Sequence, residues 1–232
     1  MLYLIGIGLD KAGFSFEAYN AVKNSRVVYL EDYTVELPFE KEDIEELIEK
    51  KTKPVDREFV ESFEVLKEAK EKNVSLLVYG SPLMATTHIS LILEAKRRKI
   101  PYRIIQGASV FDAVAETGLQ VYKFGKTASM PNFEADSFME IIKENLSIKA
   151  HTLILVDIGL KFKDAVERLE KLMTKNKINV EKAVVCEHLG LKDSRTYYNS
   201  FSKLRALKIK APFCFVIPSD LHFLEKEFLE KL

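Results

Sequence analysis

The sequence predicts an α/β fold made of two α/β domains, and three observations support this prediction. In the first half of the chain, short apolar runs alternate with patterns of helical periodicity. These apolar runs lack polar alternation, which indicates strands buried on both faces, as in a parallel sheet covered by helices. After residue 118 the chain passes through an irregular segment before strand and helix patterns resume. We therefore expect one domain over residues 1–118 and a second over residues 119–232.

The first domain is expected to contain a doubly wound, mostly parallel sheet. Its strands are predicted from runs rich in Val, Ile, Leu and Tyr, at residues 2–6, 27–30, 76–79 and 102–105. Amphipathic patterns predict helices at residues 16–25, 41–51, 57–72, 87–99 and 109–118. Open α/β sheets of this kind bind ligands beyond the carboxyl ends of their strands.

The second domain begins with a segment of mixed texture, LQVYKFGKTASMPNFEADS, which combines aromatic residues with Gly and Pro without a clear period. Beyond it, apolar runs predict strands at residues 151–158, 182–189 and 212–218. Helices are expected at residues 136–146, 162–175 and 220–232. This order of elements predicts a second α/β unit.

The composition places the chain among globular proteins and argues against several classes of partner. The 35 basic and 35 acidic residues cancel, so no excess of positive charge indicates a nucleic acid, although a local basic patch stays possible. Cys186 and Cys214 stand in apolar runs without metal-binding spacing, and we expect reduced core residues. The amino terminus lacks a basic n-region, and no apolar run approaches the roughly 20 residues of a membrane span. A cytoplasmic protein that does not enter a membrane is expected.

Glycine breaks follow three of the predicted strands of the first domain. They are YLIGIGLD at residues 3–10, YGSP at residues 79–82 and QGAS at residues 106–109. A Gly-x-Gly turn after a strand can let a ligand approach the backbone, although the third glycine of a dinucleotide fingerprint is missing. Each break alone can be a plain tight turn. Three such loops on one sheet edge would face a common crevice.

The polar residues near these loops each allow two interpretations. Thr86 or Thr87 can cap the helix that follows, or can contact a ligand. His88 can be a packed histidine or a base, and His188 and His222 are too distant in sequence to support a metal site with it. The carboxylates fall mostly on helix faces, so no acid–base pair can be named.

Six segments together resemble the diphthine synthase family of the tetrapyrrole-methylase superfamily, in order and in approximate spacing. The piece most specific to that family is TGLQVYKFGKTASMP, residues 117–131. The segments are MLYLIGIGL, VVYLEDYT, YGSPLMATTHISL, GASVFDAVAETGLQVYKFGKTASMP, HTLILVDI and IPSDLHFLEKEFL.

The resemblance implies a methyltransferase that uses S-adenosylmethionine to methylate the amino group of the diphthamide precursor on translation elongation factor 2. It also implies a mostly parallel N-terminal sheet, a mixed C-terminal sheet, a cofactor cleft between the domains, and a homodimer. No metal and no catalytic side chain are implied. By matching segments, the cofactor contacts are Leu9, Ser81, Met84, Ser109, Val110, Val156, Leu189 and Phe213.

Three positions depart from the family pattern. Ser81 replaces the aspartate of a Gly-Asp-Pro segment, so a hydroxyl without charge stands where a carboxylate could bind the cofactor. CEHLGL, residues 186–191, stands where an arginine is frequent, and Phe213 replaces a frequent histidine. Weaker cofactor affinity or a shifted substrate is therefore an open possibility. The alternatives are a related tetrapyrrole or RNA methyltransferase, and a non-catalytic relative that binds the cofactor.

The reaction implied by the resemblance is an in-line displacement, which positioning and removal of water can promote without a metal. Repeated methylation creates a fixed cation, which Tyr122 or Phe124 could face unless they are packing residues. The carboxylate of the diphthamide precursor needs a cationic partner. Lys123, Lys126 and Arg195 are candidates, with a solvated surface as the alternative. Ser109 is expected to line a cleft and not to fill a core.

Overall fold

The computed structural model describes residues 1–232, which form two compact units, Met1–Asp112 (unit 1) and Ala113–Leu232 (unit 2). The division falls before the boundary at residues 118 and 119 that the change in sequence texture predicts. The helix predicted there is short: α6 (Val110–Ala113) continues into the 3₁₀ turn η2 (Val114–Thr117) and ends at Gly118. The φ of Gly118 is +75°, a left-handed conformation that commonly ends helices.

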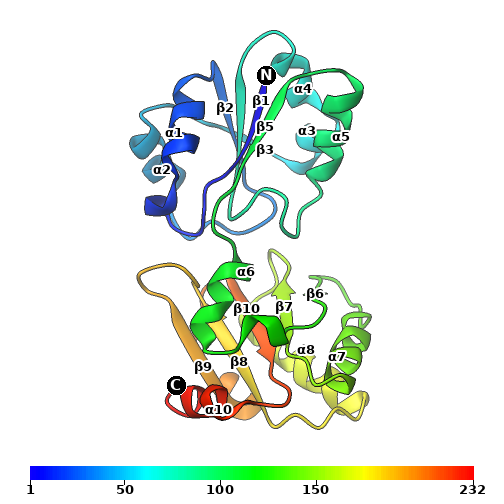
Figure 1. Ribbon diagram of the computed structural model, residues 1–232. Helices are drawn as coiled ribbons and strands as arrows, with labels where there is room; N and C mark the ends of the chain where they lie inside the picture. The colour runs from blue at the N-terminus through cyan, green and yellow to red at the C-terminus, as the bar shows by residue number, and fades with distance from the viewer. The chain divides into compact units, whose positions relative to one another are not determined.

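Unit 1 contains a five-stranded, fully parallel sheet, in agreement with the predicted sheet. The strand order is β3-β2-β4-β1-β5, and α1 and α2 lie on one side of the sheet with α3, α4 and α5 on the other (Figure 1). The strands are β1 (Leu2–Gly6), β2 (Val27–Glu31), β3 (Lys53–Val55), β4 (Val74–Val78) and β5 (Tyr102–Ile105). The helices are η1 (Lys11–Gly13), α1 (Phe16–Lys23), α2 (Lys41–Ile48), α3 (Arg57–Glu61), α4 (Glu64–Ala69) and α5 (Ile89–Arg97).

The core of unit 1 explains why its central strands were predictable. Leu2, Leu4 and Leu76 are fully buried, and removing such a side chain from water stabilises the fold by about 1.5–3 kcal/mol. The single helix predicted at 57–72 is wrong, because Phe63 takes a left-handed φ of +64° and separates α3 from α4. β3 was not predicted, since it is a short edge strand that contains a proline.

Unit 2 contains a mixed five-stranded sheet, also as expected. The order is β6-β7-β10-β8-β9, in which only the β6–β7 pair is parallel. The strands are β6 (Ala128–Met130), β7 (Thr152–Val156), β8 (Lys182–Glu187), β9 (Arg195–Ser200) and β10 (Phe213–Ile217). The helices are η3 (Val121–Lys123), α7 (Phe138–Ser147), α8 (Phe162–Lys175), α9 (Phe201–Leu204) and α10 (Phe223–Leu229).

The two cysteines face each other inside the unit 2 sheet. Cys186 of β8 lies opposite Cys214 of β10, and both are buried free thiols, which confirms the expected reduced core residues. Contact with the Cys214 thiol and burial both raise the pKa of the Cys186 thiol. A thiol that stays protonated is a poor nucleophile, so this pair is part of the core packing.

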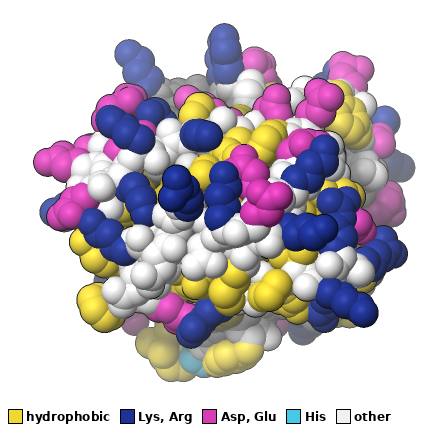
Figure 2. All heavy atoms as spheres, turned by 90° about the horizontal axis from the view of Figure 1, so that it is seen from above, with side chains coloured by type: hydrophobic (Ala, Val, Ile, Leu, Met, Phe, Trp, Pro, Cys, Tyr) yellow, Lys and Arg dark blue, Asp and Glu magenta, His cyan; other side chains and the backbone are white.

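The charged residues of the surface are mixed in sign. On the face in Figure 2, Lys and Arg side chains are numerous, and Asp and Glu side chains lie among them. Ion pairs such as Lys72–Glu68 and Arg98–Glu94 join the two signs within unit 1. None of the helices has both the length and the apolar character needed to span a membrane.

Candidate cofactor site

The carboxyl ends of three neighbouring strands of unit 1 meet through backbone atoms. β4, β1 and β5 lie side by side, and each leads into one of the three glycine loops. The Gly8 N–H donates to the Gly80 carbonyl at 3.2 Å, and the Gly80 N–H donates to the Gly8 carbonyl at 3.0 Å. The prediction that the three glycine loops share one sheet edge is therefore confirmed.

The glycines of this edge allow the loops to approach one another. A Cβ atom on Gly6 would lie 2.5 Å from the Gly80 carbonyl oxygen. A Cβ atom on Gly107 would lie 2.6 Å from both the Gly8 nitrogen and the Gly80 oxygen. At Gly6 the absence of a side chain thus serves the contact between the loops, because protein atoms already fill the Cβ position. At Gly80 the nearest atom to such a Cβ is 3.8 Å away, which leaves ordinary room.

Leu9, Ser81 and Met84 lie in two of these loops and differ in exposure. Leu9 is buried, and its carbonyl accepts a 3.0 Å hydrogen bond from the Tyr79 hydroxyl. The Ser81 hydroxyl is also buried and donates to Gln106 Oε1 at 2.7 Å, which links the second glycine loop to the third. The Met84 side chain is 51% exposed, so among these three it is the one free to contact a ligand without rearrangement.

Ser109 belongs to a closed local structure, and its place in a cleft stays a prediction. Its side chain is 4% exposed, and its hydroxyl donates to Asp112 Oδ2 at 3.0 Å. The Ser109 N–H donates to the same carboxylate oxygen at 2.8 Å. Val110, which is half-buried, begins α6. Both the N–H and the hydroxyl of Ser109 are therefore engaged within the local turn.

The threonines before α5 do not cap it. His88 occupies the N-cap position and makes no side-chain capping bond. Thr86 Oγ1 instead donates to the Pro82 carbonyl at 2.8 Å, and Thr87 Oγ1 donates to Glu61 at 3.3 Å. His88 is 1% exposed, with Nε2 at 3.2 Å from Glu31 Oε2, so the packed histidine is the alternative that the structure favours.

The three predicted contacts of unit 2 come together at one edge of its sheet. Val156 ends β7, Leu189 follows the end of β8, and Phe213 begins the antiparallel β10 that lies between those strands. Phe213 packs edge-on against Phe162, with ring centroids 5.4 Å apart. Leu189 is buried, whereas Val156 and Phe213 are half-buried. Phe213 belongs partly to the core, and Glu187 of β8 lies opposite it in the sheet.

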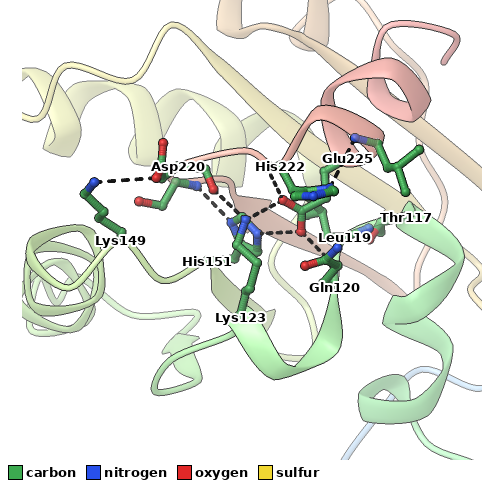
Figure 3. Close-up of polar contacts among 11 residues, drawn as sticks. Thr117, Leu119, Gln120, Lys123, Lys149, His151, Asp220, His222 and Glu225 are labelled. Carbon is green, nitrogen blue, oxygen red and sulfur yellow. Dashed lines mark hydrogen bonds and ion pairs between the residues drawn. The ribbon is translucent and has the colours of Figure 1, made fainter.

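A buried carboxylate organises the opposite part of unit 2 (Figure 3). Glu225 is fully buried and accepts hydrogen bonds from the Gln120 N–H at 2.8 Å, the His222 N–H at 2.7 Å and Lys123 Nζ at 2.5 Å. His151 Nε2 lies 3.2 Å from Oε1 of the same carboxylate. These contacts join α10 and the preceding loop to the segment most specific to the family, so we call the five residues the Glu225 cluster.

The Glu225 cluster changes the roles expected for the basic candidates. Lys123 also donates to the Asp220 carbonyl at 2.6 Å, so its ammonium is committed to a structural contact. Lys126 pairs with Glu144 at 2.5 Å on the surface. Arg195 is exposed at the start of β9 and makes no ion pair, and contact with the Tyr197 side chain raises the pKa of its guanidinium.

The two aromatic candidates, Tyr122 and Phe124, differ in exposure. Tyr122 is 84% exposed and Phe124 is half-buried, with its ring 5.4 Å from that of His151. Phe124 is therefore a packing residue, whereas Tyr122 is available to a ligand. Sequence reasoning missed Glu225 and His151, because a carboxylate on an amphipathic helix and one histidine before a strand carry no local signal of burial.

No group of three His, Cys, Asp or Glu side chains is arranged to hold a metal ion. Unit 1 offers backbone polar groups at the ends of its strands, and unit 2 offers the side chains of Val156, Leu189 and Phe213 at the ends of its own strands. Such a surface suits a small organic cofactor held by its polar atoms, in agreement with a transferase that carries its reactive group on the cofactor.

Comparison with known proteins agrees with this class and narrows it. The tetrapyrrole (corrin/porphyrin) methylases match residues 1–205. A diphthine synthase from Methanocaldococcus jannaschii is 36% identical, over 100% of this chain and 98% of that protein. A crystal structure of diphthine synthase superposes with a TM-score of 0.92 at 33% identity, over 100% of this chain and 95% of that one. The chain belongs to the diphthine synthase family of these methylases.

A fungal relative is more similar over a shorter region. A diphthine methyl ester synthase from Schizosaccharomyces pombe is 45% identical over 168 residues, which are 69% of this chain. The match spans 59% of that protein, less than two thirds of its length.

Proposed function

We propose that this protein is an S-adenosylmethionine-dependent methyltransferase that methylates the amino group of the diphthamide precursor on translation elongation factor 2. The single observation that carries this proposal is the full-length similarity to diphthine synthases, which includes both units. The three glycine loops at the edge of the unit 1 sheet support it, because open α/β sheets bind ligands at such edges.

The proposed cofactor contacts come from both units. In unit 1 the proposed contacts are Leu9 in the first glycine loop, Ser81 and Met84 in the second, and Ser109 with Val110 in the third. In unit 2 they are Val156, Leu189 and Phe213, at the ends of strands. Exposed Met84 beside buried loops whose shape is already set supports this assignment. A homodimer in the cytoplasm is part of the same proposal.

The protein's contribution to the chemistry is positioning. The bound cofactor would supply a methyl group on a positively charged sulfur. The apolar residues exclude water, and the loops fix the direction of approach for the amine, which needs no metal and no covalent intermediate on the enzyme. An α-amino group has a pKa near 8, so a substantial neutral fraction exists at pH 7 without a catalytic base. Tyr122, exposed in the most specific segment, is the proposed partner of the methylated cation.

The experiment is methyl transfer from labelled S-adenosylmethionine to elongation factor 2 that carries the unmethylated precursor. The competing acceptors are elongation factor 2 that lacks the precursor, RNA and a tetrapyrrole. Label on the precursor alone supports the proposal, whereas label on RNA or on the tetrapyrrole supports the related methyltransferases. Cofactor binding by calorimetry without any transfer would support the non-catalytic alternative. Absence of binding at millimolar cofactor would refute all of them.

The relatives carry two names, diphthine synthase and diphthine methyl ester synthase, which differ in the product that each name states. An ester methyl is removed by mild base, whereas a methyl on nitrogen is retained. Mass spectrometry of the product before and after base treatment therefore counts the methyl groups and assigns them to nitrogen or to the carboxylate.

A further inference from the structure

A buried contact links the cofactor loop of unit 1 to the neighbouring strand. Glu31 is the last residue of β2, next to β4 in the sheet, and is 1% exposed. Its Oε2 accepts from Thr34 Oγ1 at 2.9 Å and lies 3.2 Å from His88 Nε2. His88 ends the loop that begins at Gly80 and contains Ser81 and Met84. The contact therefore closes this loop at the end opposite the Gly8–Gly80 bridge.

The two nitrogens of the His88 ring differ in their surroundings. His88 Nε2 faces both Glu31 Oε2, at 3.2 Å, and the Tyr33 hydroxyl, at 3.3 Å. His88 Nδ1 is buried and has no partner. Burial of an unpartnered polar atom costs free energy, so a histidine here stabilises the fold less than its contact with Glu31 suggests. Core packing alone therefore does not explain a histidine at this position.

The loop that the pair closes is held in an unfavourable conformation. Ala85 has a φ of +55°, a left-handed value that is strained for a residue with a Cβ atom. Around it, Thr86 Oγ1 donates to the Pro82 carbonyl and the Met84 N–H donates to the Ser81 carbonyl at 3.1 Å. Such a turn persists only when anchors at both ends hold it, and Glu31–His88 is the anchor on the helix side.

We propose that Glu31 and His88 are positioning residues, which hold residues 80–87 in the strained conformation that presents Met84 to the cofactor. The proposal rests on the proposed function for the identity of the ligand. Neither side chain needs to touch the cofactor, since both act through the loop. Without the pair, the loop relaxes, and cofactor binding must repay the free energy of ordering it.

The test compares Glu31→Gln and His88→Phe with a matched control, Glu45→Gln. Glu31→Gln keeps the shape but removes the charge, and His88→Phe keeps a ring but removes the nitrogen that faces Glu31. Glu45 is also buried in unit 1 and accepts from Lys41 at 2.8 Å, Lys51 at 2.7 Å and Thr52 N–H at 2.9 Å. All of its partners lie within residues 41–52, away from the loop in sequence, so its loss reports stability alone.

Two readouts separate positioning from stability. In the folded proteins, we expect the dissociation constant for S-adenosylmethionine to rise about fivefold in Glu31→Gln and about tenfold in His88→Phe, with about tenfold in the double variant. The KM for the cofactor should rise while kcat at saturating cofactor stays unchanged. Glu45→Gln should lower the melting temperature and leave the dissociation constant within about twofold. Equal affinity in wild type and both loop variants would overturn the proposal.

A second measurement does not depend on the cofactor. Amide hydrogen exchange across residues 80–90 should speed up in Glu31→Gln and His88→Phe and stay unchanged in Glu45→Gln. Exchange that is unchanged in the loop variants overturns the positioning role, even if the wild type binds no S-adenosylmethionine and the proposed function fails. If His88→Phe does not fold, Tyr33→Phe replaces it. The Tyr33 hydroxyl lies 3.3 Å from His88 Nε2, and removing this hydroxyl should destabilise the fold less than replacing the histidine.

Discussion

Unit 1 joins the ends of its strands through backbone atoms, whereas unit 2 joins its loops around one buried carboxylate. At the glycine edge, Gly6, Gly8, Gly80 and Gly107 lie in contact because none of them has a side chain. In the Glu225 cluster, a charged side chain is enclosed by donors from three segments of the chain. The first arrangement leaves no space for an added atom at Gly6 or Gly107, and the second tolerates no lost charge. Each can be broken separately.

The largest effect is expected for Gly107→Ala. The new Cβ would meet backbone atoms of the other two loops at 2.6–2.8 Å, and none of these can move without breaking the Gly8–Gly80 bridge. We expect a loss of about 3 kcal/mol or more in the free energy of unfolding, together with loss of cofactor binding. Gly13→Ala is the control, because nothing lies within 4 Å of its Cβ position. Denaturant unfolding checks both. A stable Gly107→Ala protein would contradict the close approach of the loops.

Glu225→Gln is expected to lower the free energy of unfolding of unit 2 by about 2–3 kcal/mol, because Lys123 loses its buried counter-charge. Burial alone would raise the pKa of Glu225, but hydrogen bonds from Lys123, Gln120 and His222 outweigh it and lower that pKa to about 2. A depressed carboxyl pKa stabilises the fold above the unfolded value of 4.5, and this contribution disappears as pH falls from 4.5 toward 2.

The variant should therefore lose the acid-dependent part of the stability that the wild type shows in that pH range. Burial lowers the pKa of His151 as well, so the wild type begins to lose stability below the unfolded value of 6.5. Glu227→Gln on the same helix is the control, because Glu227 is exposed and pairs only with Lys231. Thermal melts between pH 2 and pH 7 give the comparison. Parallel stability curves for wild type and Glu225→Gln would refute the role of the cluster.

Ser81→Asp probes the glycine edge through its side chains and should have a smaller effect. Gln106 is exposed and can turn its amide so that the NH₂ group faces the new carboxylate. A charge-assisted bond to the cofactor would then raise affinity several-fold, or about 1 kcal/mol. Ser81→Asn, which lacks the charge, should not. Calorimetric titration measures both variants, alone and with Phe213→His, and unchanged affinity throughout would remove Ser81 from the site.

Tyr122→Ala should have the smallest effect on stability, within about 0.5 kcal/mol, because the side chain is 84% exposed although its neighbours are held by the Glu225 cluster. If Tyr122 faces the methylated amine, the variant should accumulate partly methylated product. Phe124→Ala, which removes a half-buried ring, is the contrast and should destabilise unit 2. Mass spectrometry of the product and a thermal melt decide between the two roles.

Elements with an uninterrupted apolar core pattern were predictable from the sequence. β1, β5 and α8 have the bounds that periodicity predicts, since their inward residues are apolar and their ends carry clear breaks. β6 and β9 were missed, because both lie at sheet edges, where fewer residues need to be apolar. The apolar pattern of 57–72 did not reveal the break at Phe63, which a reversal of one φ angle produces.

The candidate site also has features that the sequence predicted and features that only the structure revealed. The sequence by itself determined the family, the sheet types and the three glycine loops, because glycine at a strand end is a local signal of an unusual backbone. Only the tertiary structure decided what each polar side chain does. Lys123 turned inward to Glu225, Ser109 to Asp112 and His88 to Glu31. A hydrogen bond between distant residues depends on the positions of two separate elements, and local periodicity carries no information about that distance.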